Sequence, residues 1–172
     1  MTTLTTRVHV KADRETTFDH LIAFETYPEF IKHLHAVERD PERQQRVDFT
    51  LTVAGSERVH RVDVEYDRPN GRVYWNGRDG REHSGVAEIT ELNARRSALT
   101  VNVDVVLTGT LDRASAQTGV LRNQIERQLH QFAAYVEEQA GVRPARGQEG
   151  HRSPSEKLFD TVFPTDETTR GR

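Results

Sequence analysis

The chain has 172 residues, a formal net charge of −3, 34% apolar residues and no cysteine. This length fits one domain with a tail, and the missing cysteine excludes a disulfide scaffold, a thiolate-bound metal and a cysteine nucleophile. The small negative charge argues against a general nucleic-acid binder, and no apolar run approaches the roughly 20 residues of a membrane span. Since the N-terminus also lacks the apolar core of a signal peptide, we expect a cytoplasmic protein.

The N-terminal part predicts a strand followed by two short helices. Alternating apolar residues predict a strand over residues 5–10, and Asp13 is a good N-cap for a helix that continues to Glu25. Pro28 suits the first turn of a second short helix, predicted over residues 28–34.

From about residue 36 the apolar period changes to two, which is typical of strands. We expect strands near residues 47–53, 62–66, 73–75, 82–92 and 99–107. Turn residues separate them, including Gly55-Ser56 and Pro69-Asn70-Gly71. The pattern predicts an antiparallel meander with one buried face.

A long helix closes the folded part, predicted over residues 112–140. Its apolar stripe consists of Leu121, Ile125, Leu129, Phe132 and Val136, and Gly141 follows as a C′ residue. One long helix can cover the apolar face of a curved antiparallel sheet, so the predicted fold class is α+β.

The composition divides the chain into a folded domain over residues 1–140 and a polar tail over 141–172. Only six of the 32 tail residues are apolar. Residues 141–154 are typical of a flexible linker. The segment 155–163 after them has an amphipathic helical pattern, and it could dock on the domain or a partner, or form a transient helix. Its apolar face consists of Leu158, Phe159, Val162 and Phe163.

Residues 2–140 resemble the START/SRPBCC superfamily, and within it the polyketide cyclase/dehydrase and coenzyme Q-binding-like branch. Three stretches carry the resemblance: Tyr27-Pro28-Glu29-Phe30, residues 72–92 (RVYWNGRDGREHSGVAEITEL) and residues 121–138 (LRNQIERQLHQFAAYVEE). The resemblance implies a helix-grip fold, in which the curved sheet wraps around the C-terminal helix. An elongated cavity would then lie between the concave sheet and this helix. It also implies an apolar or aromatic ligand, such as a polyketide, a quinone or a lipid; we expect no cofactor.

The cavity would be lined by residues that belong equally well to an ordinary core. Tyr27 and Trp75 differ from the rest because each carries a polar atom that needs a partner when buried. The expected lining consists of Phe24, Tyr27, Phe30, Phe49, Leu51, His60, Val62, Val64, Trp75, Val101, Val103, Leu121, Ile125 and Leu129.

Three functions remain open. The first is binding of an apolar small molecule. The second is an aromatase/cyclase or dehydrase that uses Tyr27 and His60, together with Tyr66 or Tyr74, for proton transfer. Arg61, the nearest candidate for a cavity arginine, points outward by strand parity. The third is an accessory protein with a vestigial pocket.

Histidines do not predict a metal site in this chain. His33 and His35 lie two residues apart near the end of the second predicted helix. On a helix they would point to different sides, whereas on a strand they would share a face. No third ligand is near them in the sequence, so we expect no bound metal.

Overall fold

The structure is a computed structural model that describes residues 2–53, 55–78, 83–105 and 111–141, with the backbone alone at residues 53 and 111–117. The predicted tail segment 155–163 lies outside these residues. The elements follow the chain as β1 (Thr2–Val10), α1 (Arg14–Ile22), the 3-10 helix η1 (Phe24–Glu29), β2 (Leu34–Arg39), β3 (Arg46–Val53), β4 (Ser56–Asp67), β5 (Arg72–Gly77), β6 (His83–Asn93), β7 (Arg96–Val105) and α2 (Leu111–Gln139).

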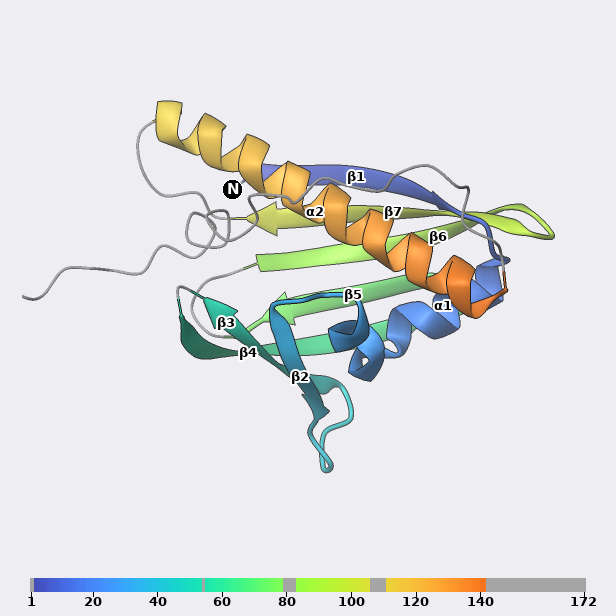
Figure 1. Cartoon of the computed structure of the whole chain (residues 1–172), viewed down its shortest axis with the longest axis horizontal. Coiled ribbons are helices and arrows are strands. Elements are labelled where there is room, and N and C mark those ends of the chain that lie inside the picture. Colours follow the sequence, from blue (N-terminus) through green and yellow to red (C-terminus); the bar gives the residue numbers. More distant parts are fainter. Residues whose placement is uncertain (1, 54, 79–82, 106–110, 142–172) are drawn as a thin grey trace, which may run out of the picture.

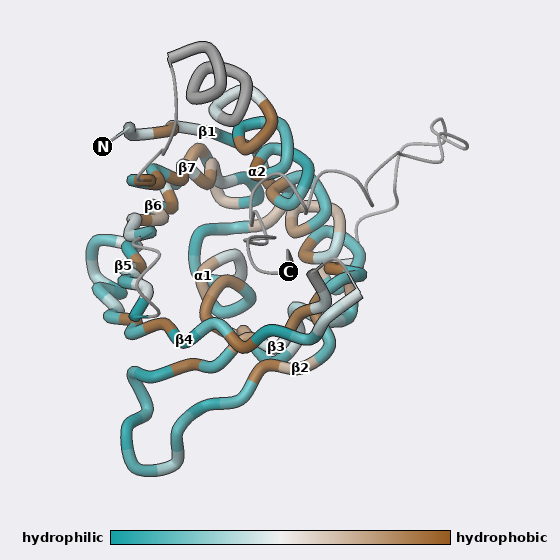
Figure 2. Tube along the Cα trace, turned by 90° about the vertical axis from the view of Figure 1, so that its left-hand side faces the viewer, coloured by the Kyte–Doolittle hydropathy of each residue, from teal (hydrophilic) through white to brown (hydrophobic). Residues whose placement is uncertain are grey.

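The seven strands form one antiparallel sheet in the order β1-β7-β6-β5-β4-β3-β2. The helix α2 crosses one face of this sheet and packs against β1 (Figure 1). Viewed from the side, the sheet curves around α1, and α2 lies next to β1 and β7 (Figure 2). The α+β helix-grip fold is therefore confirmed.

The second short helix that the sequence predicted is present, but it lies earlier in the chain, over Phe24–Glu29, and is a 3-10 helix. The first helix ends at Ile22 rather than Glu25, and Pro28 lies inside the short 3-10 helix η1. The Tyr27 carbonyl accepts hydrogen bonds from the amides of both Phe30 and Ile31, which closes the turn. The next residues pair with β3 from Leu34 onward, because this long-range pairing satisfies a whole row of backbone groups.

Local signals at the ends of the elements are confirmed. The Asp13 carboxylate accepts a hydrogen bond from the Thr16 amide at 2.8 Å, as an N-cap does. Gly71, in the predicted turn before β5, has a φ of 65°, and Gly141, two residues after the end of α2, has a φ of 75°. Glycine adopts this backbone conformation without the steric cost that a side chain adds.

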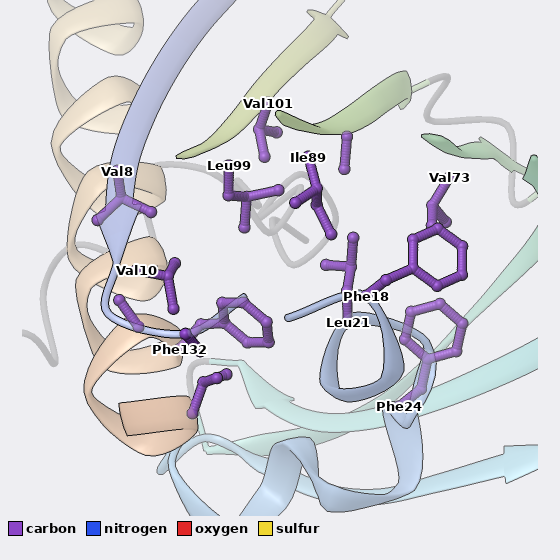
Figure 3. Packing of buried hydrophobic residues seen from close by; sticks show 14 of the residues in the cluster. Val8, Val10, Phe18, Leu21, Phe24, Val73, Ile89, Leu99, Val101 and Phe132 are labelled. Atoms are coloured by element: carbon purple, nitrogen blue, oxygen red, sulfur yellow. The ribbon is translucent and has the colours of Figure 1, made fainter. Parts of the chain in front are cut away.

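The core lies between the sheet, α1 and the C-terminal half of α2 (Figure 3). Leu21 of α1 points toward Ile89 of the sheet, the Phe18 ring lies beside Val73, and Phe132 of α2 closes the side. No helix in the described part of the chain is long and apolar enough to cross a membrane.

Candidate functional site

The sheet face that α1 and α2 cover, which we name the inner face, carries the candidate site. Successive side chains of a strand point to opposite faces. Val62 and Val64 of β4 are buried on the inner face, whereas Arg61 between them binds Asp48 through two hydrogen bonds of 2.9 Å on the outer face. The structure therefore agrees with the predicted outward direction of Arg61.

The inner face is densely packed at the end of the sheet near α1. Val73, Ala87 and Val101 lie in one row across β5, β6 and β7, and each is at most 8% exposed. Ile89 and Leu99 in the next row are fully buried. Solvent does not reach the inner face here, so this end is ordinary core.

The opposite end of the inner face is only half-buried. Trp75, Gly85 and Val103 form the row on the other side of Val73, Ala87 and Val101, away from Ile89 and Leu99. Trp75 and Val103 are both partly exposed. These strands lie inside the sheet rather than at its edges, so the half-burial of the two side chains does not come from an edge position. We name this region the open end, and its half-buried residues are Phe49, His60, Trp75, His83, Val103 and Val105.

The helix α2 shows the same gradient along its apolar stripe. Phe132 and Val136 in its C-terminal half are buried, whereas Leu121, Ile125 and Leu129 are half-buried. Apolar side chains are thus left partly exposed on both the sheet and the helix, which is typical of a small-molecule site.

Glycine lets the Trp75 ring lie flat on the neighbouring strand. Trp75 pairs directly with Gly85, and a Cβ atom at position 85 would lie 2.1 Å from the indole Cζ2. No side chain fits there, so Gly85 makes room for the indole on the inner face.

Tyr27 is placed in the closed, aromatic part of the structure. Its hydroxyl donates to the Leu21 carbonyl at 2.7 Å, and its ring packs against Phe24, Phe30 and Phe132 with centroid distances of 5.3–6.4 Å. Burial raises the pKa of Tyr27, and the nearby Tyr66 raises it further. The phenol therefore stays neutral and joins α1 to η1.

Tyr66 belongs to a polar cluster that the sequence interpretation missed. Arg39 of β2 donates to the Tyr66 hydroxyl and to the Ile22 carbonyl, each at 2.6 Å, and forms an ion pair with Glu25. The Arg39 guanidinium also lies over the Phe24 ring, 5.2 Å from its centroid. The only sequence signal was that Arg39 shares the strand parity of Val37.

The three predicted catalytic residues are not brought together. Tyr27 and Tyr66 both contact Phe24, whereas His60 lies six residues away from Tyr66 on β4, about 20 Å along an extended strand. Tyr74 lies on the outer face, paired with Val86. One reacting atom therefore cannot contact both His60 and Tyr66.

His60 instead lies near His83 of β6, a residue that the sequence interpretation did not select. The two imidazole rings are 6.3 Å apart between centroids. The signal that could have identified His83 is its parity with Ala87 and Ile89, which places it on the inner face.

The described residues hold no group of three or more histidines, aspartates and glutamates that could bind a metal ion. His33 precedes β2, and His35 on β2 is hydrogen-bonded to Thr52.

A shallow depression of about 390 Å³ is lined in part by Trp75, a residue of the predicted site, and by Gly85. Its lining comes mostly from outer-face positions of β5, β6 and β7. These are Tyr74, Asn76, Ser84, Val86, Asn102 and Asp104.

Comparison with known proteins agrees with this architecture. Residues 1–137 match the family model described as polyketide cyclase / dehydrase and lipid transport. No curated protein sequence matches the chain.

Solved structures with the same fold include the Zhui aromatase/cyclase from Streptomyces sp. R1128, with 20% identity and a TM-score of 0.66 over 86% of this chain and 99% of that chain. A START superfamily protein from Mycobacterium smegmatis has 16% identity and a TM-score of 0.60 over 81% of this chain and 97% of that chain. The di-domain aromatase/cyclase BexL has 15% identity and a TM-score of 0.68, and the match spans 80% of this chain and 47% of BexL. At these identities the similarity shows the fold.

Proposed function

Because the chain belongs to the polyketide cyclase/dehydrase and lipid transport family, we propose that it binds an apolar or aromatic small molecule between the open end and α2. The observation that carries this proposal is the half-burial of Trp75 and Val103 on interior strands, opposite a helix stripe that is also half-buried. Filling this space with a ligand would remove apolar surface from water, which favours binding by roughly 25 cal/mol per Å².

The single tryptophan of the chain provides the measurement. Trp75 lies at the open end, so a bound aromatic ligand should change its fluorescence. We suggest titration with N-phenyl-1-naphthylamine, a neutral apolar probe. Val103→Phe places a larger side chain at the open end and should weaken probe binding by about tenfold, equivalent to about 1.4 kcal/mol.

Val86→Phe is the matched control. Val86 is also half-buried, and it lies on the neighbouring strand but on the outer face. Equal probe affinity in Val103→Phe and Val86→Phe would contradict the proposed location. Complete absence of probe binding to the unaltered protein would instead favour the accessory role with a vestigial pocket.

A second candidate function is aromatase/cyclase or dehydrase activity, and the His60–His83 pair is the observation that favours it. Imidazoles exchange protons near neutral pH, and both rings belong to the open end. The test is incubation with a linear poly-β-ketone and product analysis by mass spectrometry. A cyclase changes the product distribution, and His60→Gln should abolish that change. If the intact protein does not alter the distribution, the cyclase function is contradicted and ligand binding remains as the proposed function.

A further inference from the structure

We infer that Thr6 of β1 and Gln124 of α2 form hydrogen bonds to the bound molecule, and that this molecule carries a hydroxyl group. The inference rests on the proposed binding function and specifies the polar part of the ligand. It depends on two buried polar atoms that lack a partner, on their position beside the proposed ligand space, and on the chemical group that would satisfy both.

Two buried polar atoms are exceptions to the way this core is built. Buried side-chain polar atoms normally have a hydrogen-bond partner, because burial removes their hydrogen bonds to water. Four polar residues are buried in the described part of the chain, and two of them, Thr17 and Ser97, pair through hydroxyl oxygens 2.8 Å apart. In the same part of the chain, Thr6 Oγ1 and Gln124 Oε1 are buried without a hydrogen-bond partner.

Gln124 lies in the N-terminal half of α2, which borders the proposed ligand space. It is 9% exposed, whereas its apolar neighbours Leu121 and Ile125 are half-buried. Between residues 118 and 131, all of which the structure describes, Gln124 is the only buried residue. Bulk water does not reach its amide oxygen, so the unpartnered amide lowers the stability of the protein without ligand.

Thr6 approaches the same space from the sheet. It pairs with Val101, one row from Val103 at the open end. Its parity with buried Leu4 and Val8 places it on the inner face, and α2 packs against this strand (Figure 1). The Thr6 hydroxyl therefore lies on the side of the sheet where we place the ligand.

A hydroxyl group on the ligand would satisfy both atoms. The amide oxygen of Gln124 only accepts hydrogen bonds, so its partner must donate one, whereas the Thr6 hydroxyl can donate or accept. A ketone or ether oxygen would accept from Thr6 but leave the amide oxygen unpaired. An alcohol or phenol both donates and accepts, so one such group, or two on the same molecule, completes both hydrogen bonds. The ligand is then an apolar molecule with at least one hydroxyl.

The first experiment measures stability and needs no ligand. Thr6→Val and Gln124→Met keep the approximate shape of each side chain and remove the unpartnered atom, so the urea midpoint should stay the same or rise. Thr17→Val is the matched control, since it leaves the buried Ser97 hydroxyl without its partner and should lower the midpoint. A fall in Thr6→Val and Gln124→Met as large as in Thr17→Val would overturn the inference, because both atoms would then have partners within the fold.

The second experiment compares 1-naphthol with 1-methylnaphthalene, in which a methyl group of similar size replaces the hydroxyl. Each compound competes with N-phenyl-1-naphthylamine for the protein. Thr6→Val and Gln124→Met should each lower the affinity for 1-naphthol relative to 1-methylnaphthalene by about fivefold, equivalent to about 1 kcal/mol.

Thr5→Val and Gln131→Met are the matched controls for binding, and both should leave this affinity ratio unchanged. Thr5 lies on the outer face of β1, where its hydroxyl donates to Asn102 at 2.7 Å. Gln131 is half-buried and lies two turns further along α2, next to the buried Phe132 of the closed core.

The outcomes separate this inference from the function on which it rests. An unchanged affinity ratio in both Thr6→Val and Gln124→Met would overturn the hydroxyl inference and keep the binding function. An equal fall of the ratio in Thr5→Val and Gln131→Met would also overturn it, since the effect would not depend on the two buried atoms. If N-phenyl-1-naphthylamine binds and neither naphthalene compound displaces it, the hydroxyl inference alone is overturned. If N-phenyl-1-naphthylamine does not bind, both proposals are overturned.

Discussion

The indole of Trp75 lies against the backbone of Gly85 on the neighbouring strand, where even a methyl group would come within 2.1 Å of the ring. The same methyl group would lie 2.5 Å from the Asn102 carbonyl oxygen on the other side. Because that oxygen belongs to the backbone of β7, rotation of the indole alone cannot relieve the clash. Gly85 is therefore the position on which the geometry of the open end depends.

Gly85→Ala should lower the free energy of unfolding by about 1–3 kcal/mol, since overpacking forces the indole and backbone to move. Urea denaturation measures the loss, and the Trp75 emission maximum reports the displaced ring. Gly119→Ala is the control, because no atom lies within 4 Å of a Cβ there and helical alanine is favoured over glycine. A stability of Gly85→Ala equal to that of the unaltered protein would contradict the described packing.

The two halves of α2 should respond differently to truncation. Phe132 is 4% exposed, so Phe132→Ala should cost about 3–5 kcal/mol of unfolding free energy. Ile125 is half-buried, and Ile125→Ala should cost about 1–2 kcal/mol while reducing affinity for the naphthylamine probe. Equal losses of stability in the two variants would contradict the gradient from closed core to open end.

Tyr27→Phe should lower the unfolding free energy at pH 7 by about 1 kcal/mol, since the Leu21 carbonyl loses its donor. Burial raises the pKa of Tyr27, so its contribution is complete below the unfolded value near 10 and decreases as the pH rises above 10. Denaturation at pH 7 and pH 10.5 measures this decrease. The variant should lose less stability than the unaltered protein over this interval; an identical loss would show that the phenol is not buried.

Asp13→Ala should destabilise the protein by about 0.5–2 kcal/mol at pH 7 through loss of the helix cap. Hydrogen bonds from the Thr16 hydroxyl and amide lower the pKa of Asp13, so its contribution is present above pH 4 and is lost as the pH falls through the folded-state pKa. Asp13→Asn keeps an acceptor and should retain part of the stability at pH 7 without this acid dependence. Unfolding curves at pH 7 and pH 3 test both variants.

Most strands and α2 could be predicted from the sequence because alternation and helical periodicity are properties of neighbouring residues. The turn before β5 and the cap at Asp13 have the same local origin. The strand over residues 34–39 was not predicted, because its conformation depends on pairing with β3. The position of the second short helix was wrong because Pro28 is compatible with more than one kind of turn. The tail and the boundary of the domain at residue 140 stay predictions, since residues 142–172 are outside the described part.

The amino-acid sequence by itself determined the α+β class, the resemblance to the helix-grip superfamily and the parity that turns Arg61 outward. Only the tertiary structure decided which lining residues are core, because burial of Val62 or half-burial of Trp75 depends on what covers the inner face. It also separated Tyr66 from His60 and brought His83 close to His60. The physical reason is that strand register joins residues far apart in the chain, whereas periodicity records only near neighbours.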